Sequence, residues 1–303
     1  MRRLAFLLLF CVGGVALTSG AGANTPPPDY HSIVPVEGLE SVLTMQVDSV
    51  VSIDTNGGLT DFRMETPVPD SLRNNLDRIV RQWRFIRTPS AGPVMPINTR
   101  MRITLSATKL GEKYQIRVDN VIFTGDEKDP GKPAAALASI AAKRLVPPQY
   151  PIGLERLNIG GLVLLGLKVG NDGRVEDVVA VQTILRDVSG APKVLGQAVA
   201  TLEQSALRAA RTWRFEVPAG FAKEDAGHHT ITVPIVFLPS GSSEESVPGQ
   251  WRTEVRGQRR EMDWLKPNPE LQRIGASDTV NGEVLPLASS IRLETDVVGT
   301  VIM

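Results

Sequence analysis

Histidine is the residue type in this 303-residue chain with the widest range of catalytic and metal-binding chemistry. The chain has three histidines, and they are His31, His228 and His229. Adjacent residues on a strand point to opposite faces, so His228 and His229 are not expected to share a metal ion. His31 lies far from both in the sequence. We therefore expect no zinc-type site.

Acidic residues give no clearer signal for catalysis. The pairs Glu176–Asp177 and Glu244–Glu245 lie in a predicted hairpin and a predicted linker. Asp54–Gly57 and Asn171–Gly173 offer oxygen ligands, but neither is followed by the bidentate acidic residue of an EF-type calcium loop. The sequence also lacks a G-x-S-x-G elbow and a phosphate-binding loop. We expect no enzyme, no metal and no cofactor.

Charge and the first residues limit the partners and the compartment. Lys and Arg total 33 and Asp and Glu total 33, which disfavours nucleic acid as a partner. Residues 1–23 combine Arg2 and Arg3 with an apolar run and the small residues Ala21–Ala23, the pattern of a secretory signal peptide. We expect cleavage and export to the periplasm, with an uncleaved inner-membrane anchor as the alternative. Cys11, the only cysteine, lies inside this segment, so no disulfide is expected.

Two stretches of the chain read as copies of one another. Residues 51–62 and 167–178 each consist of an apolar run, a turn and a second apolar run. The alternation predicts two β-hairpins, and Asn56-Gly57 indicates a type I′ turn in the first. Each hairpin is followed by the same three-residue motif, Trp-Arg-Phe, at residues 83–85 and 213–215.

The helices predicted between hairpin and Trp-Arg-Phe repeat as well. Their apolar positions fall on one helical stripe and keep the same spacing in both copies, with a constant offset of 130 (202 − 72). The stripe consists of Leu72, Leu76, Ile79, Val80 and Trp83 in the first copy and Leu202, Ala206, Ala209, Ala210 and Trp213 in the second.

A third strand is predicted to close each copy, at residues 99–105 and 231–237, with an offset of 132 (231 − 99). The first copy adds a predicted fourth strand at 114–123. The fold class expected from this pattern is α+β, with two small β-β-α-β units, each an antiparallel sheet with one helix packed on one face.

The predicted organisation has six segments. They are a signal peptide or anchor (1–23), a short proline-containing linker (24–40), the first unit (41–124), a linker with an alanine-rich helix over 134–145 (125–143), the second unit (144–239) and a linker and tail (240–303). In the tail, Asn281-Gly282 predicts a turn and residues 290–302 a closing strand or hairpin.

The second unit resembles the carboxyl-terminal domain of the TonB energy transducer family. The resemblance rests on an ordered set of short motifs: Pro148–Pro151, Gly161, the hairpin with Asn171-Asp172-Gly173, the helix ending Ala209–Phe215 and the strand Val233–Phe237. The first unit is similar only through its hairpin, helix and Trp83–Phe85, and resembles a degenerate tandem copy.

The resemblance implies a non-enzymatic periplasmic module that binds the short TonB box of an outer-membrane receptor in nutrient or siderophore transport. The bound peptide extends an edge strand through backbone hydrogen bonds. The partner-binding residues that the resemblance implies are Gln149, Tyr150, Ile231, Val233, Ile235 and Phe237.

Three departures from the family pattern leave a second reading open. Residues 4–21 contain no histidine to face a motor complex, Pro26–Pro28 is too short to cross the periplasm, and Pro147 stands where the family often has glutamine. The alternative is a structural or assembly protein of the cell envelope that pairs with another protein or, as a homodimer, with itself. Membrane contact is expected only through an uncleaved first segment.

Overall fold

The structure is a computed structural model that describes residues 38–87, 96–126, 141–217, 228–241, 247–267, 269–280, 287 and 291–303. The predicted signal peptide, residues 127–140 of the predicted linker and the predicted Asn281-Gly282 turn lie outside these ranges.

The first copy begins with the long strand β1 and continues through a helix to a second hairpin. Its elements are β1 (Leu39–Ile53), β2 (Leu59–Met64), α1 (Asp70–Val80), β3 (Phe85–Arg87), β4 (Ile97–Leu110) and β5 (Lys113–Asp126).

After β6 and α2, the second copy repeats this order as far as its third long strand. Its elements are β6 (Ala141–Arg144), α2 (Ile152–Arg156), β7 (Gly161–Gly170), β8 (Val175–Arg186), α3 (Pro192–Ala210), β9 (Arg214–Glu216) and β10 (His228–Phe237). The remainder of the chain contains β11 (Arg252–Gly257), the 3-10 turns η1 (Asp263–Leu265), η2 (Pro269–Gln272) and η3 (Ala276–Asp278), and β12 (Ile291–Leu293).

The two copies have the same strand register. In the first, Val51 pairs with Phe62 of β2 and Thr99 of β4. In the second, Leu167 pairs with Val178 of β8 and Ile231 of β10, so all three positions shift by the offsets seen in the sequence. The bulge at the end of the hairpin is also repeated, between Ser52/Ile53 and between Lys168/Val169. The duplication therefore extends to the pairing of the backbone.

The prediction of two small, separate β-β-α-β units is wrong, because the strands of both copies form one eight-stranded antiparallel sheet. Its order is β10-β7-β8-β11-β1-β4-β5, and β2 pairs with the second half of β1. β11 joins the copies, since it pairs with Leu39–Thr44 of β1 and with residues 184–186 of β8. The sequence offered no assignment for the residues of β11.

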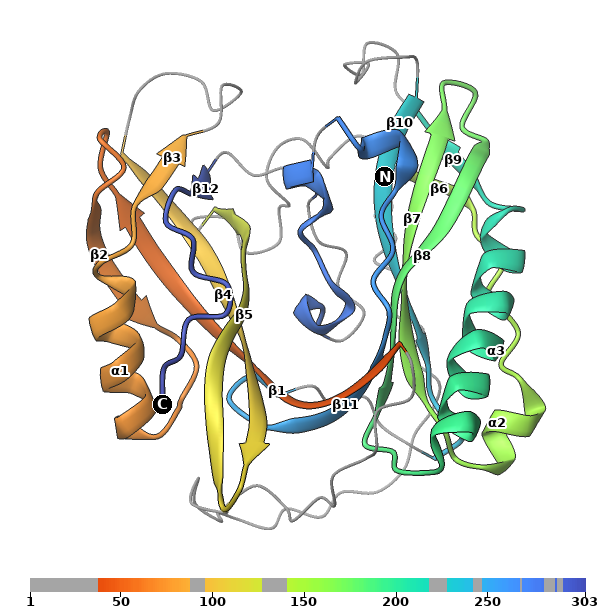
Figure 1. Ribbon diagram of the computed structural model, residues 1–303. Coiled ribbons are helices and arrows are strands. Elements are labelled where there is room, and N and C mark those ends of the chain that lie inside the picture. Colours follow the sequence, from red (N-terminus) through yellow and green to blue (C-terminus); the bar gives the residue numbers. More distant parts are fainter. Residues whose placement is uncertain are drawn as a thin grey trace.

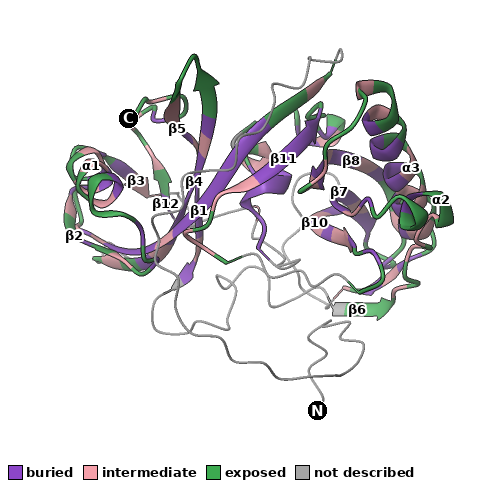
Figure 2. Cartoon of the chain, turned by 90° about the horizontal axis from the view of Figure 1, so that it is seen from below, coloured by how far each residue is buried: buried purple, intermediate pink, exposed green. Residues whose placement is uncertain are grey.

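The sheet curves into an arch with one copy on each side (Figure 1). α1 and α3 lie on the outer, convex face of the two sides, and the segment between β11 and β12 enters the concave side. Seen from below, β1 and β11 are mostly buried where they cross the middle of the molecule (Figure 2). Both faces of the sheet are therefore covered over much of its area.

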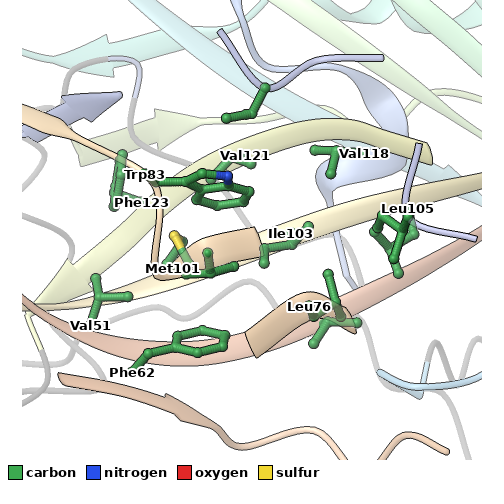
Figure 3. Close-up of a cluster of buried hydrophobic side chains, with 14 of the residues drawn as sticks. Val51, Phe62, Leu76, Trp83, Met101, Ile103, Leu105, Val118, Val121 and Phe123 are labelled. Carbon is green, nitrogen blue, oxygen red and sulfur yellow. The ribbon is translucent and has the colours of Figure 1, made fainter. Parts of the chain in front are cut away.

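The helix stripes predicted from the sequence contact the convex face of the sheet. In the first copy Leu72, Leu76 and Val80 of α1 join Trp83 and a set of strand residues in one buried cluster. Figure 3 shows the indole of Trp83 close to residues of β5 in this cluster. The second copy forms the corresponding cluster with Leu202, Ala206, Ala210 and Trp213. Burial of these stripes is the main favourable contribution of the helices to folding.

The Trp-Arg-Phe motifs form backbone hydrogen bonds with the hairpin turns. The Phe85 amide donates to the Gly57 carbonyl (3.0 Å), and the Phe215 amide donates to the Gly173 carbonyl (2.8 Å). Both glycines have positive φ, +79° and +76°. Each Trp-Arg-Phe motif therefore holds the turn of its own hairpin through a backbone hydrogen bond. This contact explains why the motif is duplicated together with the hairpin.

The turn type predicted for the first hairpin is wrong. A type I′ turn needs positive φ at both central residues. Among the described non-glycine residues, only Asn158 and Asp187 have positive φ, so Asn56 does not. Gly57 donates to the Asp54 carbonyl, and the glycine in the left-handed region closes a longer loop of the bulged kind.

Two further predictions concern the segment between the two copies and the tail that follows them. The predicted helix over 134–145 is wrong at its described end, because residues 141–144 form β6, which pairs with β9. β12 pairs with β3, so each Trp-Arg-Phe segment gains one strand from a distant part of the chain. The predicted strand or hairpin in the tail is present as β12 and as a backbone pairing of residues 299–303 with β5.

We predict that Gly173→Ala lowers the free energy of unfolding by more than about 2 kcal/mol. A Cβ at this position would lie 1.9 Å from the Phe215 carbonyl oxygen, and the backbone has positive φ. Gly111→Ala is the matched control, since Gly111 has φ +62° but open space around it, and it is expected to lose about 1 kcal/mol. Urea titration measures both. Equal losses would contradict the proposed contact.

Candidate functional site

The outer edge of β10 is the main candidate for a binding site. β10 is the last strand of the sheet and pairs only with β7 among the described residues. Pro234 suits this position, because a residue without an N–H is tolerated on an edge strand. Unpaired backbone groups along an edge can accept a further strand.

The opposite edge of the sheet is different, because the chain covers part of it. The amides of Ile116 and Val118 in β5 donate to the carbonyls of Met303 and Thr300, both at 3.0 Å. The amides of Ile302 and Gly299 return two bonds at 2.8 Å, and Ile302 is buried in the cluster below α1. Residues 299–303 therefore act as an added strand on β5, and β10 has no such cover within the described residues.

The side chains of β10 divide between the two faces of the sheet. Ile231, Val233 and Ile235 are partly buried and pack against the cluster below α3. Phe237 belongs to the same cluster and is only 3% exposed. These four predicted site residues thus face the core, and a partner at this edge would meet mainly backbone groups and the outer sides of Val233 and Ile235.

The segment before α2 places the other two predicted residues beside the end of β10. Residue Tyr150 stacks near Phe237 with ring centroids 6.0 Å apart, and its hydroxyl donates to the Ile159 carbonyl at 2.8 Å. Burial, with a smaller contribution from Glu155, raises the pKa of the Tyr150 hydroxyl, which therefore stays a hydrogen-bond donor at neutral pH. The structure brings Tyr150 and Phe237 together.

Gln149 differs from Tyr150 in exposure. Its side chain is exposed, while its backbone carbonyl accepts a hydrogen bond from the Ser205 hydroxyl on α3. The Trp213 indole donates to the Val146 carbonyl at 2.8 Å, so this segment is fixed to the second copy at both ends. Gln149 is thus held in place by its backbone and presents its amide to solvent.

A second feature, which the sequence did not indicate, lies on the concave side of the arch. Residues 274–280 are all buried there, between the two copies. Toward β7 and β8 this segment offers Ile274 and Ala276 to an apolar cluster that includes Leu162, Leu164 and Ile184. Toward β1, β4, β5 and β11 it makes polar contacts. We call residues 274–280 the inner segment.

Asp278 is the centre of the polar contacts. Its carboxylate accepts hydrogen bonds from the Thr104 hydroxyl (2.6 Å), the Asn120 side-chain amide (2.6 Å) and the backbone amide of Gly275 (2.8 Å). Arg102 donates to the Asp278 carbonyl at 3.1 Å and forms an ion pair with Asp48 at 2.6 Å. Three strands, β1, β4 and β5, and the inner segment meet through this side chain and its neighbours.

β11 contributes a buried charged pair to the same region. Glu254 is 1% exposed and accepts from the Ser277 hydroxyl at 2.5 Å. Arg256 lies 3.3 Å from Glu254 and 2.9 Å from Asp119 of β5. A buried charge without a partner is strongly unfavourable, so these contacts fix the distance between β11 and β5. The alternating polar residues of β1, β4 and β11 were the available signal for this cluster, but they resemble a solvated face.

Metal and catalytic chemistry find little support in the described residues. Among them, no group of three or more His, Cys, Asp or Glu side chains has a metal-binding arrangement. His229 is buried, and its Nε2 lies 3.2 Å from the Asn171 side-chain oxygen in the hairpin turn. Ser277 and Glu254 contact each other without a histidine between them.

No protein-family model matches this chain, and no curated protein matches it. Across the described residues, none of the helices has the length and apolar character that a membrane span requires. The geometry of β10 and its surroundings therefore carries the functional argument.

We predict that wild-type stability falls with rising pH relative to Asp278→Asn. Burial raises the pKa of Asp278 above its ordinary value of 3.8, and the three hydrogen-bond donors oppose this only in part. The folded state therefore binds the proton more tightly than the unfolded state, so wild-type stability decreases from about pH 4 until the raised pKa is passed. Urea titrations from about pH 4 to about pH 8 compare the two proteins. Parallel curves would contradict the prediction.

Proposed function

We propose that this protein is a periplasmic TonB-like binding module that engages an extended, TonB box-like peptide of an outer-membrane receptor or another envelope protein. The peptide adds to the outer edge of β10 through backbone hydrogen bonds. The observation that carries the proposal is that β10 ends the sheet and pairs only with β7 among the described residues.

The support around β10 favours binding without large rearrangement. β7 pairs with β10 over ten residue pairs, and α3 packs behind the two strands. The segment that carries Gln149 is fixed to α3 and to Trp213. A rigid edge loses little conformational entropy when a peptide adds to it, so more of the interaction energy appears as affinity.

The exposed edge also supports a second function, self-association within the cell envelope. An unpaired edge strand accepts another copy of itself by the same backbone contacts. The two functions differ in stoichiometry. A peptide-binding module is monomeric by light scattering until peptide is added, whereas self-association through β10 makes the mass depend on protein concentration.

We predict that a labelled TonB box-like peptide shifts the backbone amide signals of residues 229–237 in a titration of the full mature chain followed by NMR. Pairing changes the hydrogen bonding of these amides directly. The amides of β2, which belongs to the other copy, serve as the internal control. Shifts that spare β10 would overturn the proposed function.

Val236→Pro is predicted to weaken peptide binding by about tenfold. Val236 lies two residues from Pro234, so both backbones point the same way, and we expect that direction to be the outer edge of the sheet. The substitution removes one N–H donor from that edge, a loss of about 1 kcal/mol, and adds a ring that hinders the partner strand. Val236→Ala is the control. Equal affinities of the two variants would contradict pairing at this edge.

Gln149→Ala is predicted to weaken peptide binding about threefold while leaving stability unchanged. Its side chain is exposed, and its structural contact uses only the backbone carbonyl. Loss of one exposed hydrogen bond to the partner is worth about 0.7 kcal/mol. Isothermal titration and urea unfolding measure the two quantities. A loss of stability without a change in affinity would assign Gln149 to the fold.

A further inference from the structure

The outer side of α3 carries an open hollow of about 370 Å³. It is lined by residues of α3 and its C-cap, namely Ala200, Glu203, Gln204, Leu207, Arg208 and Arg211. From residue 200 to residue 211 it follows the helix for about 16 Å, at 1.5 Å per residue. Figure 1 shows α3 at the periphery of the second copy, on the convex side of the sheet. The hollow is therefore distinct from the edge of β10 and from the inner segment.

Two arginines supply the positive charge of the hollow. Arg208 and Arg211 are exposed, and their guanidinium groups form no ion pair or hydrogen bond with any described residue. The carboxylate that lines the hollow, that of Glu203, is buried and already bound. Its Oε1 lies 3.0 Å from Nη1 of Arg260 and accepts a hydrogen bond of 3.0 Å from the Thr183 hydroxyl. The charge of the two arginines is thus not neutralised within the part of the chain that the structure describes.

The first copy shows how one of these arginines can be neutralised. Arg211 corresponds to Arg81 at the offset of 130 (211 − 81). Nε and Nη2 of Arg81 donate to the two carboxylate oxygens of Asp77, both at 2.8 Å. Leu207 stands at the position of Asp77 in the second copy (207 − 77 = 130). Arg211 therefore lacks the partner that its equivalent has.

The other acidic residue of α1 differs between the copies in the same way. Asp70 corresponds to Ala200, whereas Arg78 is matched by Arg208, both at the offset of 130 (200 − 70, 208 − 78). Ala200 and Leu207 both line the hollow. The helix of the second copy thus has the same two cations as the first, with apolar residues at both acidic positions. Acidic neighbours would stabilise a solvated helix face, so their replacement favours a surface that meets a partner.

We propose that this hollow binds an acidic segment of a partner protein, with two carboxylates on Arg208 and Arg211 and an apolar side chain against Leu207. The planar guanidinium group suits carboxylates, because its parallel N–H groups form bidentate pairs. Residues three apart are neighbours on a helix surface, so one short segment reaches both arginines. About five extended residues match the length of the hollow, at about 3.3 Å per residue. The inference does not rest on the proposed function, since no residue of β10 lines the hollow.

The test titrates the full mature chain, labelled for NMR, with the end-capped peptide Ser-Glu-Ser-Glu-Ser-Leu-Ser at low salt, where charges are screened least. Its glutamates and leucine lie on alternate residues and share one face of an extended chain. We expect shifts of the amides of residues 200–211 and of the side-chain signals of Arg208 and Arg211. A peptide with glutamine at both glutamate positions is expected to bind about tenfold more weakly or worse.

The equivalent arginines of the two copies provide matched variants. The double variant Arg208→Gln, Arg211→Gln is expected to weaken binding about tenfold or more, and Arg78→Gln, Arg81→Gln on α1 is expected to leave it unchanged. Equal effects of the two double variants, or no shift of residues 200–211, would overturn the inference. A molecular mass that rises with protein concentration and returns to the monomer value in the Arg208, Arg211 variant would make a second copy the occupant, and would also overturn it.

Two further substitutions restore acidic residues where α1 has them. Leu207→Asp is expected to abolish the shifts, because the new carboxylate can pair with Arg211 as Asp77 pairs with Arg81. Leu207 is partly buried, so Ala200→Asp, at an exposed position, serves as the second variant and is expected to weaken binding severalfold while the protein stays folded. Urea titration checks the fold of both. Undiminished binding by the two folded variants would contradict the inference and leave the function proposed for β10 untouched.

Discussion

Six residues at the start of β1 pair with β11, and the joining of the two copies depends on this ladder. β11 uses its other edge for β8, so a short strand late in the chain connects sheets that would otherwise have separate edges. The connection also creates the concave side of the arch. Glu254 and Arg256 of β11 lie on that side as a buried charged pair. The pairing of β1 with β11 therefore joins the two copies. It also forms one side of the polar cluster.

The inner segment, residues 274–280, also holds the two copies together. Its apolar side chains contact the second copy, and Asp278 binds side chains from β4 and β5 of the first. Because buried polar groups need specific partners, the two copies are held in one relative arrangement rather than sliding past each other. β10 therefore lies at the edge of a single rigid body. A strand added at that edge would extend a sheet that is already formed.

The sequence predicted the local elements and missed the connection between them. Helix stripes such as Leu202, Ala206 and Ala210 depend on contacts near in sequence, and their periodicity is complete within each copy. The polar positions Gln46, Arg102 and Thr104 alternate with apolar ones as on a solvated face, yet they are buried beneath residues more than 150 positions later. Alternation shows which face is polar but not what covers it. For the site, the family resemblance named Tyr150 and Phe237 separately, and their ring contact is visible only in the structure. The resemblance also indicated that the strand containing Val233–Phe237 is an edge strand, and the strand order has β10 at the end of the sheet.

The segments that finish the first copy have a consequence for the order of folding during synthesis. The core of the first copy includes Ile291, Val297 and Ile302. The first strand of this copy, β1, pairs with β11, which is synthesised much later. The second copy, from β6 to β10, draws its cluster mainly from nearby residues. Contacts between nearby residues form before those that close long loops. As the chain emerges from the ribosome, the copy that is made first is the copy that is completed last.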